Sequence, residues 1–398
     1  MRNVKRRYGL YIGAMMLAAL FCLLTVTGTA RAESARNIVD QCHLYAPQNT
    51  EKLGNAHDGN DFTMWSCSEA SYLQFEVPEG QRVHGMYIKW GMDVPEWQIV
   101  KAEDGSEVLC GGREGHAHEF SPCSLGSGVY RLKLTGSPGD GRMRIREIAL
   151  YTDGELPKDV QVWQVPPDKV DLMAMPAHPD DELLFFGGTL PYYAGELKKD
   201  VLVVYPTCAT YNRRTEMLNG LWHCGVRLYP VIGPFDDEKF YTANEMYRHW
   251  GGREKVLQYF TEVIRRYRPD VIVTHDVNGE YGHGGHMAVC ASVTDAVTRT
   301  AADAAYETQS APWQVKKLYV HLYNEQTRDM NWEIPLEAFD GKTAFQVAEA
   351  AFLCHESQTQ SFNMHSDGSY SCRRFGLAYS SVGDDVSMDD FFENINKE

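Results

Sequence analysis

The sequence lacks a Cys-x-x-Cys pair, a basic stripe, a tandem repeat and any low-complexity tract. The missing Cys-x-x-Cys argues against a zinc ribbon. Basic residues are also scarce, because 38 Lys and Arg stand against 54 Asp and Glu, which gives a formal charge of −16. A surface of this sign repels phosphate backbones, so no nucleic acid is expected as a partner.

The N-terminus differs from the rest of the chain. Four basic residues lie between positions 2 and 7, an apolar run follows, and the small residues "ARA" end at Ala32. This order is typical of a signal peptide, which would comprise residues 1–32. The alternative is an uncleaved membrane anchor, since the apolar run approaches the length of a membrane span. We expect a secreted or cell-surface protein in either case.

Ten cysteines are present, and one of them, Cys22, lies in the expected signal. An oxidising compartment would allow the others to pair. Proximity along the chain predicts four disulfides and leaves Cys290 as a buried thiol. The expected pairs are Cys42 with Cys67, Cys110 with Cys123, Cys208 with Cys224, and Cys354 with Cys372.

The length of 398 residues predicts two domains. Residues 35–152 alternate short apolar runs with Gly, Pro, Asp and Ser turns, which is typical of an antiparallel β-sandwich. Residues 153–169 are rich in proline and polar residues and are interpreted as a linker. Residues 170–398 would form the second domain.

The second domain alternates apolar runs with helical periodicity. Strands are expected at 171–175, 201–207, 226–231, 270–275 and 316–323, and helices at 213–225, 253–269 and 286–303. Such alternation favours an α/β fold with a Rossmann-like, mostly parallel sheet and helices on both faces. Ligands of these sheets bind beyond the carboxyl ends of the strands.

The stretch "AHPDDE" follows the first of these strands. His178 and Asp181 are three apart, so a helical turn would place both on one face. His286, after another strand, adds a second imidazole. Two histidines and one carboxylate suit a divalent metal such as zinc and leave positions for water and substrate. A cation would also explain the crowding of Asp180, Asp181 and Glu182, whose like charges raise one another's pKa.

Three further side chains fit hydrolytic chemistry at such a metal. Asp180 is placed to act as a general base, His283 to protonate a leaving amine, and Tyr281 to hydrogen-bond an oxyanion. Each has an ordinary interpretation when taken alone, as an acidic helix start or a residue of a Gly-rich loop. Their combination at two strand ends of one domain favours a metal site.

"AHPDDE" with the later "YGHxxH" resembles the PIG-L or LmbE-like family of zinc-dependent deacetylases, which remove acetyl groups from N-acetylglucosamine-type amines. The resemblance covers about residues 170–390. It implies that His178, Asp181 and His286 bind zinc, that Asp180 is the base, that His283 is the acid or an electrostatic partner, and that Tyr281 contacts the oxyanion.

The same resemblance implies that Arg213 binds substrate hydroxyls and that Asp236 or Asp237 contacts the sugar. The alternatives are an ion pair between Arg213 and Glu216 and a plain acidic turn. Relatives commonly carry Pro-Asp between the two loop histidines, where this chain has Gly284 and Gly285. An acid at this place could tune the neighbouring imidazole of His283, and the glycine pair predicts a more open site for a larger substrate.

"NAHDGNDFTMW" and the later "RIREIALY" resemble the discoidin, or coagulation-factor C-type, sandwich, which is often used to bind carbohydrate. Oxygen ligands for a structural Ca²⁺ are expected from Asp58, Asp61, Thr63 and Glu147. The alternative for these residues is an Asp-Gly turn and a paired strand glutamate.

These observations predict an exported zinc-dependent hydrolase that removes acetyl groups from N-acetylated amino sugars of glycans or glycoconjugates. The expected partner is an N-acetylated carbohydrate, and a membrane only if the signal remains uncleaved. One alternative keeps the metal but acts as an O-acetyl esterase or another amidase. The other is a non-catalytic surface protein that binds glycans.

Overall fold

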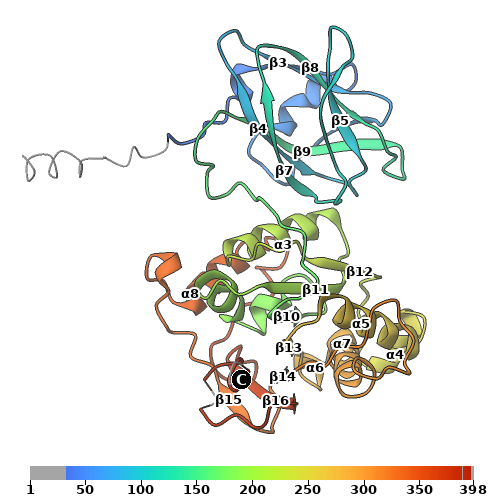
Figure 1. Ribbon diagram of the computed structural model, residues 1–398, viewed down its shortest axis with the longest axis vertical. Coiled ribbons are helices and arrows are strands. Elements are labelled where there is room, and N and C mark those ends of the chain that lie inside the picture. Colours follow the sequence, from blue (N-terminus) through green and yellow to red (C-terminus); the bar gives the residue numbers. More distant parts are fainter. Residues whose placement is uncertain (1–32, 388, 396–398) are drawn as a thin grey trace, which may run out of the picture.

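The computed structural model describes residues 33–387 and 389–395, so the expected signal peptide lies outside the described residues. Figure 1 shows an all-β part followed along the chain by an α/β part, with helix α3 between the β-sandwich and the central sheet. No helix in the described part of the chain combines the length and hydrophobicity that a membrane span requires.

The first part is a sandwich of two antiparallel sheets with strand orders β1-β3-β8-β5-β6 and β2-β9-β4-β7. Its strands are β1 (His43–Tyr45), β2 (Trp65–Ser68), β3 (Leu73–Val77), β4 (Val83–Trp90), β5 (Trp97–Lys101), β6 (Glu107–Gly111), β7 (His118–Leu125), β8 (Gly128–Leu134) and β9 (Arg142–Tyr151). Residues Leu73, Phe75 and Val77 of β3 are buried while the residues between them are not, as a half-covered strand requires.

The second part contains a seven-stranded sheet of order β12-β11-β10-β13-β14-β16-β15. Its strands are β10 (Leu172–Met175), β11 (Val201–Thr207), β12 (Val231–Phe235), β13 (Val271–Thr274), β14 (Lys317–His321), β15 (Thr327–Asp329) and β16 (Arg374–Ser380). The first five strands of this order pair in parallel, and β16 and β15 add an antiparallel edge. The α/β class with a mostly parallel sheet is therefore confirmed.

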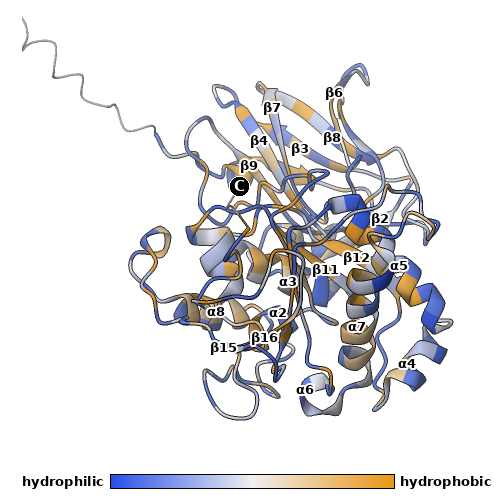
Figure 2. Cartoon of the chain, turned by 60° about the horizontal axis from the view of Figure 1, so that its bottom comes forward, coloured by the Kyte–Doolittle hydropathy of each residue, from blue (hydrophilic) through white to orange (hydrophobic). Residues whose placement is uncertain are grey.

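Helices cover both faces of this sheet. They are α2 (Asp181–Leu184), α3 (Tyr211–His223), α4 (Ala243–His249), α5 (Arg253–Tyr267), α6 (Gly279–Gly282), α7 (Gly284–Asp295) and α8 (Ala344–Phe352). Leu172 and Ala174 of β10 pack in one core with α3 and α8, while Met173 and Met175 pack in another with α4, α5 and α7. Figure 2 shows the strands of the sheet as largely hydrophobic between helices whose outer faces are more polar.

One expectation about local structure is corrected. The strand expected at 226–231 lies later, as β12 (Val231–Phe235), and residue 228 forms only an isolated bridge with Gln164. Most residues of the segment 153–169, interpreted as a linker, are exposed, while Val160, Gln161 and Trp163 are buried.

None of the nine described cysteines forms a disulfide. Cys208 precedes α3 and Cys224 ends it, so the 13-residue helix separates them by about 20 Å at 1.5 Å per residue. A disulfide needs Cα atoms within about 7 Å of each other. That expected pairing is therefore wrong, because the intervening residues form a continuous helix.

Candidate metal centre

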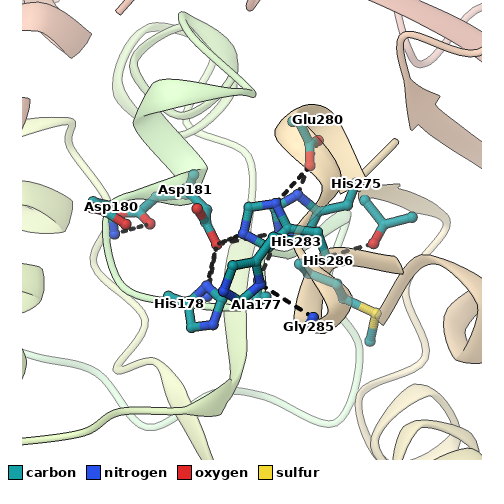
Figure 3. A network of polar contacts seen from close by, with 12 residues as sticks. Ala177, His178, Asp180, Asp181, His275, Glu280, His283, Gly285 and His286 are labelled. Atoms are coloured by element: carbon teal, nitrogen blue, oxygen red, sulfur yellow. Dashed lines mark hydrogen bonds and ion pairs between the residues drawn. The ribbon is translucent and has the colours of Figure 1, made fainter. Parts of the chain in front are cut away.

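The candidate site lies where β10 and β13 end side by side. These strands pair in parallel with Met175 opposite Thr274, so the residues that follow them meet at one edge of the sheet. His178 and Asp181 come from the segment after β10, and His286 comes from the first turn of α7. Figure 3 shows the three side chains pointing toward one another.

Asp181 is the hub of this cluster. Its Oδ2 accepts a hydrogen bond from the His178 backbone N–H at 2.8 Å and lies 3.0 Å from His178 Nδ1. The same oxygen lies 3.3 Å from His286 Nε2 and 3.3 Å from His275 Nε2. Although burial alone would raise it, His286 and His178 hold the pKa of Asp181 well below its ordinary value. Asp181 is therefore ionised at neutral pH.

The residues fit a divalent metal. His178 Nε2 and His286 Nε2 are buried and have no hydrogen-bond partner among the described residues, which is costly for a nitrogen donor or acceptor without a ligand. Side-chain donors of His178, His283 and His286 lie within 4.8 Å of one another, as do those of Asp181, His275 and His286. Buried imidazoles with one carboxylate are a donor set that zinc accepts.

A second layer orients these ligands through Glu280, whose side chain is fully buried. Glu280 Oε2 lies 2.6 Å from His286 Nδ1, and its Oε1 lies 3.1 Å from His275 Nδ1 and 2.9 Å from His321 Nδ1. Because Glu280 is bonded to Nδ1 of His286, the other ring nitrogen, Nε2, faces Asp181. Metal-binding histidines commonly use their other ring nitrogen in this way.

Sequence reasoning missed Glu280 and His275. Their signal was present, since His275 directly follows the strand β13 and Glu280 precedes His286 by six residues along the chain. Glu280 also has a left-handed backbone with φ of 54°, which an acidic residue adopts only where its surroundings hold it there.

Replacing Glu280 with Gln is expected to weaken zinc binding about 10- to 100-fold. Both carboxylate oxygens of Glu280 accept hydrogen bonds from imidazoles, Oε2 from His286 and Oε1 from His321. In the Gln variant one of these oxygens becomes an NH₂ group, which would lie against a histidine N–H. Competition with a chromophoric chelator measures the affinity. Glu262→Gln, on α5 and bonded to Ser310, is the matched control. Equal zinc affinity for both variants would contradict the orienting role of Glu280.

Asp180 stands beside the cluster and points away from Asp181, toward Arg213. Its backbone is left-handed with φ of 112°, and its N–H donates to Glu182 Oε2 at 2.9 Å. Arg213 Nη2 lies 3.3 Å from Asp180 Oδ1 and also donates to the carbonyl of Pro179. Burial, and then the neighbouring Asp181, raise the pKa of Asp180 to about 7. A carboxyl group of this kind can take up and return a proton near neutral pH.

His283 begins α7 and accepts a hydrogen bond at Nδ1 from the Gly285 N–H, at 3.1 Å. Burial, and then His178 and His286, lower the pKa of His283 to about 3. The imidazole is therefore neutral, with its proton on Nε2.

The glycine pair has a packing reason. A Cβ at Gly284 would lie 2.6 Å from the Thr242 carbonyl oxygen, and one at Gly285 would lie 3.0 Å from His283 Nδ1. Gly284 N–H also donates to the Phe240 carbonyl at 2.7 Å. The pair brings the segment before α4 against the site, and the backbone at 240–242 takes the space beside it.

The cluster opens into a cavity of about 360 Å³. Asp237 lines it and lies 3.5 Å from His178 Nε2, whereas Asp236 is seen only as a backbone acceptor for Trp250. Tyr281 lines it too, with 42% of its surface exposed. Further lining side chains that the sequence did not indicate are Leu184, Lys239 and Phe362.

Arg213 also lines the cavity. In place of the alternative ion pair with Arg213, Glu216 is bonded to Ser357. Glu216 accepts from the Ser357 N–H at 2.9 Å and from its hydroxyl at 2.7 Å. The C-terminal segment is thereby tied to α3, and the neighbouring Gln358 enters the lining.

The expected calcium residues divide into two groups. Asp58 accepts from the Thr63 hydroxyl at 2.9 and 3.0 Å, and the Asn60 N–H donates to both Asp58 and Glu147. Asp61 instead accepts from Lys89 Nζ at 2.7 Å. Burial, and then a hydrogen bond with Asp58, raise the pKa of Glu147 to about 7.

The raised pKa of Glu147 predicts a pH effect on sandwich stability. The folded protein holds this proton more tightly than the unfolded chain, so the contribution of Glu147 is full below about pH 4.5 and is lost as pH rises through about 7. Glu147→Gln keeps the acceptor for Asn60 and should unfold at a higher temperature than the unchanged protein at pH 8, but not at pH 4.

Thermal unfolding of both proteins at pH 4 and pH 8 measures this effect. The same difference in unfolding temperature between the two proteins at pH 4 and at pH 8 would contradict the raised pKa of Glu147.

The fold and the cluster together define an α/β protein with a buried His and Asp site at the carboxyl edge of a mostly parallel sheet. Residues 173–297 match the model of the PIG-L family, described as GlcNAc-PI de-N-acetylase.

Among curated relatives, a 1D-myo-inositol 2-acetamido-2-deoxy-alpha-D-glucopyranoside deacetylase of Rhodococcus erythropolis is 30% identical over 179 residues, which cover 37% of this chain and 59% of the relative. The chain thus spans less than two thirds of that relative's length.

Two solved structures resemble parts of the chain. An N,N'-diacetylchitobiose deacetylase from Pyrococcus horikoshii is 15% identical with a TM-score of 0.34, over 48% of this chain and 71% of that one. A family 32 carbohydrate-binding module from Clostridium perfringens, solved with galactose, is 17% identical with a TM-score of 0.25, over 30% of this chain and 99% of that one.

Proposed function

We propose that the protein is an exported zinc-dependent hydrolase that removes acetyl groups from N-acetylated amino sugars of glycans or glycoconjugates. The main support is the convergence of His178, Asp181 and His286 beside a cavity that contains Asp180 and Arg213. The PIG-L domain and the deacetylase relative support the reaction class. The basic and apolar N-terminus supports export.

We assign the zinc ligands to His178, Asp181 and His286. Zinc, when bound, supplies a Lewis acid for the acetyl carbonyl and the attacking water. Asp180 takes a proton from that water and returns it to the amine nitrogen as the C–N bond breaks, which leaves acetate and a free amino sugar. Asp180 is buried beside the assigned ligands, and a positioned carboxyl group can serve both transfers.

Neutral His283 is a hydrogen-bond donor through Nε2, so we assign it to the developing oxyanion together with the hydroxyl of Tyr281. The proton for the leaving amine then comes from Asp180. Arg213 and Asp237 face the same cavity and would hold the sugar hydroxyls. The apolar side of the cavity, formed by Leu184 and Phe362, suits the face of a sugar ring.

One experiment tests this proposal. Metal analysis of the purified protein is combined with a screen for acetate release from N-acetylated and O-acetylated glycans. We expect one zinc per chain and acetate from N-acetyl sugars, and a strong chelator should abolish its release. Acetate from O-acetyl sugars alone would identify an esterase, and zinc-free protein that only binds glycans would refute a hydrolase.

A further inference from the structure

The first turn of α3 contacts the sandwich through three residues. Tyr211 Oη donates to Asp93 Oδ2 at 3.3 Å, and Arg214 Nη1 donates to Asp93 Oδ1 at 2.8 Å. Arg146 Nη2, from β9, donates to Asn212 Oδ1 at 2.7 Å. Hydrogen bonds therefore join both the beginning and the end of the first turn of α3 to the sandwich.

Arg213 is the exception in this turn. Successive residues of an α-helix are about 100° apart, so positions 211, 212 and 214 occupy an arc of about 160° and position 213 lies opposite its centre. Arg213 accordingly turns away from the sandwich and reaches Pro179 O and Asp180 Oδ1. One turn of helix thus joins the sandwich to the proposed base.

The sandwich side of this joint is buried and hydrogen-bonded. Arg146 is 1% exposed, and its Nη1 donates to the Asp61 carbonyl at 2.6 Å. The Asp61 carboxylate accepts from Lys89 Nζ and from Asn219 Nδ2, the latter at 2.8 Å and six residues further along α3 than Arg213. Bonds to charged groups of this kind are short and directional.

We propose that Asp93 and Arg146 are positioning residues for the deacetylation reaction. They fix the first turn of α3 and, through it, the guanidinium of Arg213 beside Asp180. The sandwich is then a part of the catalytic framework. The expected loss of activity rests on the proposed function, whereas the expected loosening of the first turn of α3 does not.

The test uses the full-length protein with Asp93→Ala and Asn212→Ala combined. The Asp93 side chain is 70% exposed and Asn212 is exposed, so both changes spare the core. We expect kcat/KM for acetate release to fall about 10- to 100-fold, mainly in kcat, because small displacements of a positioned group are costly. Glu254→Ala is the control for loss of an exposed side-chain hydrogen bond, since Glu254 accepts from Tyr306 away from this interface. Asn219→Ala removes hydrogen bonds to Asp61 and Gln161 of the same interface while leaving the bonds of Tyr211, Asn212 and Arg214 in place.

A double-mutant cycle separates positioning from a general structural role. In an Arg213→Ala background the same pair of substitutions should cause no further loss, because the group through which they act is absent. Equal losses in both backgrounds would overturn the proposal.

Hydrogen exchange of the amides of residues 213–217 gives a readout that needs no substrate. Exchange should be faster in the Asp93→Ala/Asn212→Ala protein than in Asn219→Ala and in the unchanged protein. Unchanged exchange would overturn the inference. If the unchanged protein releases no acetate from any sugar, the proposed function fails, and the exchange data alone decide whether the sandwich holds this turn.

Discussion

Asp180→Asn is expected to lower kcat for acetate release by about 10²- to 10⁴-fold while KM stays close to that of the unchanged protein. The amide has the same shape and keeps an oxygen toward Arg213, which lies 3.3 Å from Asp180 Oδ1. It cannot take a proton from water or return one to the amine. The effect therefore falls on the chemical step rather than on binding.

Zinc content is the decisive companion measurement for this variant. Asp180 is not one of the assigned ligands, so Asp180→Asn should retain as much zinc as the unchanged protein. Asp270→Asn is the control, because Asp270 is 7% exposed and pairs with Lys169 at the opposite end of β13. An Asp180→Asn protein with full activity would remove this carboxylate from the mechanism.

The convergence of His178, Asp181 and His286 could be predicted from sequence because its determinants are local. "AHPDDE" places His178 and Asp181 within one turn after a strand, and the parallel sheet brings the end of β13 next to the end of β10. The strands themselves were visible as apolar runs, since a parallel sheet covered on both faces buries nearly every residue of β10, β11 and β13.

Other features depend on tertiary contacts that local patterns do not encode. Glu280 is recognisable as an orienting residue only when His275, His286 and His321 have been brought around it from three segments. Asp61 matched a calcium motif, yet its carboxylate meets Lys89 of the sandwich and, across the interface between the two halves, Asn219 of α3.

The same limit applies to the choice between Asp236 and Asp237 and to the expected strand at 226–231. Neighbouring acids in a turn face different directions, and only the packed loop shows that Asp237 enters the cavity. In the apolar run at 226–231, Val226 and Leu228 are buried in the two cores of the α/β part, and the backbone around Leu228 bonds to Gln164. The hydrophobicity of this run therefore reflects core packing rather than pairing in the main sheet.

His286→Ala is expected to reduce both zinc content and acetate release to background. The substitution removes the nitrogen that faces Asp181 Oδ2 at 3.3 Å and leaves Glu280 without the partner at 2.6 Å. Loss of a catalytic metal removes several kcal/mol of transition-state stabilisation, and each 1.36 kcal/mol is about tenfold in rate. We therefore expect a fall of about 10³-fold or more.

This prediction is tested together with Asp180→Asn. Asp180→Asn should lose activity and retain zinc, whereas His286→Ala should lose both. His249→Ala is the matched control for imidazole removal, because His249 is an exposed residue at the end of α4. Elemental analysis after dialysis against a weak chelator measures the zinc of all three proteins. If His286→Ala kept its zinc, the ion would be bound elsewhere, and the separated segments after β10 and β13 would not act as one metal site.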